Sequence, residues 1–230
     1  MKKNTYYLKA RLFPTIICAI PILSTYFFGF SDKAKSFVDF LQGFTWTGDV
    51  TISVALIFLM VQTNRFAAKE IFQRFFFKDE IKMPTTNYLL HSDSFFSKDI
   101  KRRLYLKVFN DFKITLADED SENQNELEAR KTIITAVSQI RNTTRENKLL
   151  LQHNIEYGFM RNLVGGAAVA GIISLFNLYY FSQITSVDFA FKMNLVLIII
   201  YLIPILFSKV IVKRYGHYYA KVLFEQYLNN

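Results

Sequence analysis

Long apolar runs lie near both ends of the chain, and a charged middle segment separates them. Four runs stand out, at about residues 12–30, 46–63, 163–184 and 191–212. Each is close to the roughly 20 residues that an α-helix needs to cross a hydrocarbon core about 30 Å thick. The pattern therefore predicts an all-α membrane protein with four transmembrane helices.

The first run could also be a secretory signal peptide, because four basic residues precede it within the first 11 positions. No small-x-small cleavage site follows, and an aromatic triplet at residues 26–28 stands where one would be needed. Pro14 and Pro21 are tolerated in membrane helices. We therefore favour a retained transmembrane helix.

The basic residues orient the chain. Lys and Arg number 4 in residues 1–12, 17 in residues 64–161 and 4 after residue 207. The two short connections, 31–49 and 185–192, together hold only 3. Because cytoplasmic segments carry an excess of Lys and Arg, both termini and the middle segment are predicted to be cytoplasmic.

This topology predicts four segments. Residues 1–63 form an N-terminal tail and the first two transmembrane helices. Residues 64–161 form a helical, ligand-binding cytoplasmic domain inserted between spans two and three. Residues 162–212 form the last two transmembrane helices, and residues 213–230 a cytoplasmic tail.

The composition excludes several other classes of protein. A hydrophobic share of 51% and an aromatic share of 17% exclude a disordered or low-complexity chain. The single cysteine, Cys18, excludes a disulfide scaffold, and the three histidines are far apart. We find no glycine-rich phosphate loop and no catalytic or metal-binding motif. We therefore expect a protein that is not an enzyme and has neither catalytic residues, a metal site nor a cofactor.

Helices are predicted within the cytoplasmic segment at residues 64–77, 97–113 and 126–157. Ser97 is the expected N-cap of the second helix. An acidic loop at residues 118–125 is expected to be solvated, and the third helix is long enough to continue into the third span.

Basic residues gather on the last two of these helices. Three of them, at spacings of four and three residues in the third helix, would share one face. The candidate anion ligands are Lys101, Arg102, Arg103, Lys107, Arg141, Arg145 and Lys148. They either form a solvated face beside an anionic membrane or bind a polyanion such as a nucleotide or oligonucleotide, and copies in a ring would focus their potential.

Aromatic residues near these basic positions could stack the bases of a single strand, but a place in the protein core is the more common role for each of them. They are Tyr88, Phe95, Phe96, Tyr105, Phe109 and Tyr157.

Small and weakly polar residues mark the third span. Its small-xxx-small pairs allow close helix packing, either within one chain or between copies. The candidate pore or packing residues are Gly165, Gly166, Ala170, Ser174 and Asn177. Because Asp49, Lys192 and Lys209 lie near the ends of their runs and no Asp, Glu, Lys or Arg is evident deep inside the spans, an ion-coupled transporter is disfavoured and a passive pore is left open.

Two stretches resemble a family of small four-span bacterial proteins. The first is PTTNYLLH at residues 84–91, followed by KRRLY at 101–105. The second is NIEYGFMRNLVG at residues 154–165. Leu90 and Met160 depart from the family, because many members have a basic residue there. By these motifs the chain resembles the Hailong-type membrane effectors of bacterial anti-phage defence.

The resemblance implies a function. In such systems a nucleotidyltransferase-like partner makes short DNA oligomers, and the effector holds them in a basic cytoplasmic chamber. Ligand loss opens a channel, disrupts the membrane and causes abortive infection. The chain would then be a homo-oligomer, expected to be a tetramer, in the bacterial inner membrane. Two alternatives stay open: a non-conducting sensor or scaffold that recruits a defence partner, and a protein whose basic residues bind lipid headgroups.

The second motif lies where the cytoplasmic helix is predicted to enter the membrane. Gly158 would permit a bend, Arg161 would reach the headgroups, and Asn162 would cap the third span. We hypothesise that this junction, comprising Asn154, Tyr157, Gly158, Arg161 and Asn162, transmits ligand occupancy to a pore.

Overall fold

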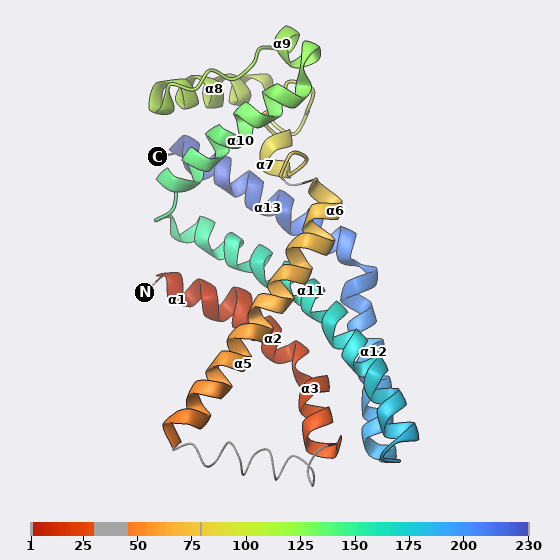
Figure 1. Ribbon diagram of the computed structural model, residues 1–230. Coiled ribbons are helices and arrows are strands. Elements are labelled where there is room, and N and C mark those ends of the chain that lie inside the picture. The colour runs from red at the N-terminus through yellow and green to blue at the C-terminus, as the bar shows by residue number, and fades with distance from the viewer. Residues whose placement is uncertain (1, 30–45, 79, 230) are drawn as a thin grey trace. The chain divides into compact units, whose positions relative to one another are not determined.

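The computed structural model describes residues 2–29, 46–78 and 80–229, with side chains described from residue 4 in the first range and from residue 54 in the second (Figure 1). All regular structure in these ranges is helical, which confirms the predicted all-α class. The contacts divide the chain into two units. The apolar unit comprises residues 1–72 and 159–208, and the polar unit comprises residues 73–158 and 209–230.

The first apolar run is a bent series of short helices in the apolar unit: α1 (Lys2–Tyr7), η1 (Leu8–Leu12), α2 (Phe13–Cys18), α3 (Ile20–Ser24) and η2 (Thr25–Gly29). The helical pair on either side of Ala19 is bent by 40°. Pro21 follows the bend directly, and its ring removes an amide donor from the helix. The run predicted as the first span is therefore a broken helix instead of a straight one.

The other apolar runs lie on longer helices. These are α5 (Trp46–Phe66), α11 (Lys148–Gln183) and α12 (Asp188–Leu206). By length and composition, α11 and α12 could each cross a membrane, and the bent N-terminal pair adds a third candidate if it counts as one span. Residues 46–53 of the predicted second span lie outside the described side chains.

Helical structure continues beyond α5 as η3 (Ala67–Gln73) and α6 (Arg74–Phe77), as predicted for residues 64–77. The polar unit then contains α7 (Pro84–Asn87), α8 (Lys98–Phe112), α9 (Glu119–Gln124) and α10 (Glu126–Thr143). The Ser97 hydroxyl caps α8 by accepting a hydrogen bond from the Ile100 amide, at 3.4 Å. Both the helix and its N-cap were thus predicted correctly.

The acidic segment at 118–125 differs from its prediction. It forms α9, capped by Asp118, whose carboxylate accepts a hydrogen bond of 2.8 Å from the Ser121 amide. Glu122 is only 3% exposed. The prediction of a loop was therefore wrong, and the prediction of solvation holds for residues 118–121 and 123–125 but not for Glu122, which accepts hydrogen bonds from buried backbone amides described below.

The predicted single helix from 126 to 157 is also wrong, because residues 144–147 interrupt it. The Thr144 hydroxyl donates to the Ile140 carbonyl at 2.7 Å, and Thr144 leaves helical geometry at φ −89°, ψ 2°. Asn147 then accepts a hydrogen bond from the Leu150 amide at 3.0 Å and so caps α11. Thr and Asn side chains compete with the helical backbone for hydrogen bonds, which hydrophobic periodicity does not register.

The C-terminal segment, expected to be a tail, is the helix α13 (Ser208–Asn229). Its residues from 209 onwards belong to the polar unit, and Figure 1 shows them running past α7 and α10. Leu223 and Phe224 are fully buried, as are Leu104 of α8 and Ile133 of α10. The core of the polar unit therefore combines the middle of the sequence with its end.

Candidate functional site

The segment that joins α7 to α8 is held in place by a buried lysine. Lys101 is 6% exposed, and its ammonium donates to the carbonyls of Leu90 at 2.5 Å, of His91 at 3.4 Å, and of Asp93. Burial lowers the pKa of Lys101, while the charges of Asp93 and Glu122 oppose this effect. All three ammonium protons have backbone acceptors. Lys101, a predicted anion ligand, therefore stabilises a loop and is left out of the candidate ligand surface.

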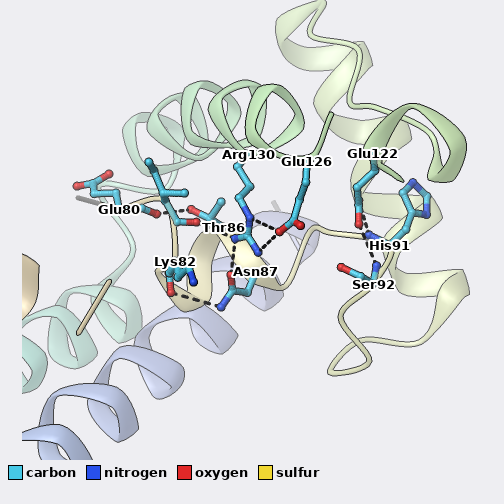
Figure 2. A network of polar contacts seen from close by, with 10 residues as sticks. Glu80, Lys82, Thr86, Asn87, His91, Ser92, Glu122, Glu126 and Arg130 are labelled. Atoms are coloured by element: carbon cyan, nitrogen blue, oxygen red, sulfur yellow. Dashed lines mark hydrogen bonds and ion pairs between the residues drawn. The ribbon is translucent and has the colours of Figure 1, made fainter. Parts of the chain in front are cut away.

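Two further residues, Tyr105 and Glu122, bind the backbone of residues 89–92, and Figure 2 shows Glu122 with His91 and Ser92. The Tyr105 hydroxyl donates to the Leu89 carbonyl. The Glu122 carboxylate accepts from the amides of His91, at 2.7 Å, and Ser92, at 3.1 Å. Lys101 and Tyr105 donate to the backbone carbonyls of this turn, and Glu122 accepts from its backbone amides. Both kinds of backbone polar group in the turn therefore have hydrogen-bond partners.

Arg130 of α10 fastens the other end of the motif, as Figure 2 shows. Its guanidinium donates to the Ile81 carbonyl at 2.8 Å and to the Asn87 side chain at 2.7 Å, and it pairs with Glu126 at 2.7 Å. No sequence pattern singled out Arg130, because two of its partners, Ile81 and Asn87, lie more than 40 residues away in the chain. The PTTN segment, residues 84–87, thus has a structural role: its hydrogen bonds fix it within the polar unit.

The exposed face of α8 differs from its buried face. Arg102 and Arg103 are exposed, and neither guanidinium group makes a hydrogen bond or ion pair with the part of the chain that the structure describes. Phe109 is 47% exposed, and the Lys113 ammonium lies 5.7 Å from its ring centre. We call Arg102, Arg103, Phe109 and Lys113 the α8 surface. Guanidinium groups bind phosphate in a bidentate manner, and an exposed phenyl ring can stack a base.

The other predicted anion ligands are not gathered there. Lys107 lies on α8 but is half-buried, 3.8 Å from Asp111 and 5.3 Å from the Tyr227 ring centre. Arg141 contacts Glu80 at 3.5 Å and the Thr85 hydroxyl at 3.4 Å. Arg145 and Lys148 are exposed, one in the turn after α10 and the other at the start of α11. The expected shared face of Arg141, Arg145 and Lys148 does not exist, because the helix break separates them.

Most of the aromatic candidates belong to the core. Tyr88, Phe96 and Tyr157 are buried, and Tyr105 is half-buried. Phe95 is exposed but stacks on Tyr88, with ring centres 4.0 Å apart. Phe109 is therefore the candidate best placed to meet a base.

The apolar unit exposes large apolar side chains and buries several polar ones. The exposed positions on its helices include Phe13, Leu59, Leu175 and Ile199, each at least 50% exposed. Its buried polar residues include Thr15, Ser24, Asn64, Asn162, Ser174, Asn177 and Asn194. An apolar exterior around an interior that contains hydrogen-bonded polar side chains suits a hydrocarbon solvent, in which helices associate through packing and interhelical hydrogen bonds.

One polar cluster joins three helices of this unit. The Asn177 amide group donates to the Pro21 carbonyl at 2.8 Å and to the Asn194 side-chain oxygen at 3.0 Å. The Thr25 hydroxyl donates to the Asn177 oxygen at 2.7 Å, and Asn194 donates to the Ser24 hydroxyl at 2.8 Å. The cluster thereby fastens the bent first span to α11 and α12.

Two more side-chain hydrogen bonds compensate for prolines in the first apolar run. A proline has no amide proton, so the carbonyl four residues before it lacks its usual helical donor. Pro14 cannot donate to the carbonyl of Ala10, and the Asn162 amide group donates there instead, at 2.6 Å. Pro21 cannot donate to the carbonyl of Ile17, and the Tyr201 hydroxyl donates there, at 2.8 Å. Asn162 therefore lies inside α11 and compensates a proline in another helix. The prediction that it caps the third span was wrong.

The small residues of α11 mark close contacts within the chain. A Cβ on Gly165 would lie 2.4 Å from the Ala68 amide nitrogen, and one on Gly166 would lie 2.8 Å from the Cys18 sulfur. Ala170 belongs to a buried cluster with Cys18, Leu197 and Tyr201. Of the two uses left open for these residues, the geometry favours packing within one chain. Ser174 is fully buried, and its hydroxyl has no hydrogen-bond partner among the described residues.

The predicted junction residues all lie on α11. Asn154 is half-buried, and the Tyr157 ring stacks on Tyr219 with centres 6.3 Å apart. The helix continues through Gly158, and the boundary between the two units falls directly after it. Arg161 is 8% exposed. The junction is thus a continuous helix shared by both units.

Comparison of the chain with known protein families, with curated proteins and with solved structures gives no match.

Proposed function

We propose that this protein is an oligomeric membrane effector of bacterial anti-phage defence, whose polar unit binds a short phosphate-bearing ligand and thereby controls a channel. The observation that carries the proposal is the α8 surface. Two adjacent arginine side chains without partners in the described chain lie on the same helix as an exposed phenylalanine, Phe109, whereas Lys101 and Tyr105 of that helix make hydrogen bonds to backbone carbonyls of the fold. This arrangement suits the backbone and a base of a short DNA oligomer.

The proposed topology has four membrane-spanning helices, at about residues 12–30, 46–63, 163–184 and 188–206. The last ends with α12, earlier than the residue 212 expected from the sequence, because residues from 209 onwards belong to the polar unit. Support comes from α11 and α12, which are long and apolar enough, and from the bent N-terminal pair. The described part of α5 adds an outward row of apolar side chains, including Leu56, Phe58 and Leu59. The excess of Lys and Arg in the polar unit and near both termini supports a cytoplasmic location for them in the proposal, because cytoplasmic segments of membrane proteins are enriched in these residues.

The proposed route from ligand to channel is α11. This helix begins in the polar unit and ends in the apolar unit, where Asn177 is hydrogen-bonded to the bent first span. A displacement of α11 along its axis would act on that polar cluster, which links three helices. Oligomerisation, expected as a tetramer, would place several such units around a shared axis.

Binding of a fluorescently labelled single-stranded DNA oligomer to the detergent-solubilised protein tests the ligand part. We expect saturable binding that weakens as salt concentration rises, because phosphate binding releases counterions. Arg102→Glu with Arg103→Glu should weaken it more than about a hundredfold, at about 1–3 kcal/mol for each lost contact. Lys131→Glu with Lys221→Glu is the matched control, since it removes two exposed cations from other helices of the same unit.

Ion flux through liposomes tests the channel part. Flux that changes with the DNA oligomer supports the proposal, and its dependence on Arg102 and Arg103 links it to the α8 surface. Ligand binding without any flux would instead favour the non-conducting sensor or scaffold. Absence of arginine-dependent binding would contradict the proposed ligand site.

A further inference from the structure

Three arginines from three segments of the apolar unit surround one closely packed crossing. The Asn162 amide group donates to the Ala10 carbonyl at 2.6 Å, and Asn64 donates to the Thr15 hydroxyl at 3.2 Å. The first bond joins α11 to η1, and the second joins α5 to α2, which follows η1 directly. Arg11 adjoins Ala10, Arg65 adjoins Asn64, and Arg161 adjoins Asn162.

Each of the three arginines is at least partly withdrawn from solvent. Arg161 is 8% exposed, and Arg11 and Arg65 are half-buried. The Nε atom of Arg11 is buried and has no hydrogen-bond partner among the described residues. The Arg11 guanidinium also lies 5.4 Å from the centre of the Tyr6 ring. A buried guanidinium donor without an acceptor is costly, so an acceptor from outside the chain would stabilise this arrangement.

The charges around this crossing reinforce one another. Burial lowers the pKa of Arg65, and the positive charges of Arg11 and Arg161 lower it further, against a small opposing effect of Tyr6. Three clustered, partly desolvated positive charges attract an anion more strongly than the same three charges dispersed over a hydrated surface.

The chain position of the three arginines indicates where the anion comes from. Arg11 directly precedes the first proposed span, Arg65 follows the second, and Arg161 precedes the third. All three therefore lie at the same ends of the proposed spans, at the level of the lipid headgroups. Exposed apolar side chains lie beside them, including Leu8, Phe13 and Phe66, each at least 45% exposed.

We propose that Arg11, Arg65 and Arg161 bind the phosphate of an anionic phospholipid on the cytoplasmic side of the membrane. The site is distinct from the α8 surface and depends only on the membrane topology of the proposed function. A bound headgroup would supply an acceptor for Arg11, neutralise the cluster and join the first three proposed spans. The lipid would thus be a structural ligand of the bundle.

Native mass spectrometry of the full chain tests this site. The protein is reconstituted in phosphatidylcholine with added phosphatidylglycerol, extracted into detergent, and scored for retained phosphatidylglycerol. Arg11→Gln with Arg65→Gln spares the buried Arg161 and should reduce retention about thirtyfold, since each headgroup-facing arginine contributes about a fivefold factor. Lys9→Gln with Lys69→Gln removes two exposed cations from the same helical segments and should retain the lipid.

Two outcomes would overturn the proposal. In the first, phosphatidylglycerol is retained equally by wild type and by the arginine variant, with both eluting as the same oligomer. In the second, inorganic phosphate or a single-stranded DNA oligomer displaces the lipid at low concentration, which would assign the cluster to a soluble phosphate ligand. DNA binding through Arg102 and Arg103 is measured separately, so failure of the lipid site is distinguishable from failure of the proposed function.

Discussion

The Tyr201 hydroxyl donates a hydrogen bond of 2.8 Å to the carbonyl oxygen of Ile17, the carbonyl that the amide of residue 21 would meet in a regular α-helix. Residue 21 is a proline and has no amide proton. Tyr201 is 2% exposed, so its hydroxyl has little access to solvent. A side chain of α12 thus compensates for a proline in the first span, and Asn162 does the same for Pro14.

Tyr201→Phe should therefore destabilise the apolar unit by about 1 kcal/mol, because it leaves the Ile17 carbonyl without this donor. Pro21→Ala restores a backbone donor at the same carbonyl. The effect of Tyr201→Phe should be smaller in a Pro21→Ala background than in the wild type. Thermal unfolding of the four proteins in detergent gives the coupling energy of this double-mutant cycle.

Tyr26→Phe is the matched control for that cycle, because Tyr26 belongs to the same bent segment and is 47% exposed. Its effect should be within about 0.5 kcal/mol and independent of residue 21. Strict additivity of Tyr201→Phe and Pro21→Ala would show that the hydroxyl does not compensate for the proline.

Gly165→Ala should prevent normal packing of the apolar unit. The added Cβ would lie 2.4 Å from a backbone nitrogen of Ala68, so the helices themselves must move apart. We expect a loss of about 3 kcal/mol or more, visible as reduced yield and aggregation on size-exclusion chromatography. Gly171→Ala is the control on the same helix, since its Cβ would meet only the Ile205 side chain at 4.0 Å. Equal behaviour of the two variants would contradict the close crossing.

Lys101→Met should destabilise the polar unit by about 3 kcal/mol, because three carbonyls lose a charged donor. Arg103→Met, two residues along α8, should change stability by less than about 0.5 kcal/mol while weakening DNA binding. Limited proteolysis and the DNA-binding assay separate the two effects. If Lys101→Met folded as well as wild type but lost DNA binding, Lys101 would be a ligand residue after all.

Some elements of this fold could be predicted from the sequence and others could not. The all-α class and the N-cap at Ser97 follow from local signals: apolar runs, and a hydroxyl placed before an amphipathic segment. The break after Thr143 does not, because it depends on Thr144 and Asn147 competing for backbone groups and on the Asn147 hydrogen bond to Gln226. That partner is 79 residues away in the chain.

The candidate site shows the same limit. Charge alone groups Lys101 with Arg102 and Arg103, but only the fold shows that Lys101 points inward to backbone carbonyls. Asn162 and Tyr201 could have been matched to prolines only by knowing which helices cross. The signal that was available is the pair of prolines in an apolar run, each of which requires a donor from elsewhere.

His217 of α13 predicts a dependence of protein stability on pH that can be tested. The Tyr88 hydroxyl lies 2.7 Å from its Nδ1 atom. Burial and the charge of Asp93 raise the pKa of Tyr88 to about 12, so the hydroxyl keeps its proton. Desolvation lowers the pKa of His217, with Asp93 opposing and Lys213 adding to this effect. The neutral imidazole is therefore the acceptor, and protonation would remove that acceptor.

Because the pKa of His217 is lower in the folded than in the unfolded state, the unfolded chain binds more protons as pH falls below about 6.5. The stabilisation is thus present above that pH and decreases as pH falls towards the lower pKa of the folded state. The unfolding temperature of the wild type should fall more between about pH 8 and about pH 5 than that of His217→Gln. The effect should be modest, because the imidazole is partly exposed. Parallel curves for wild type and His217→Gln would show that the Tyr88–His217 contact does not respond to pH.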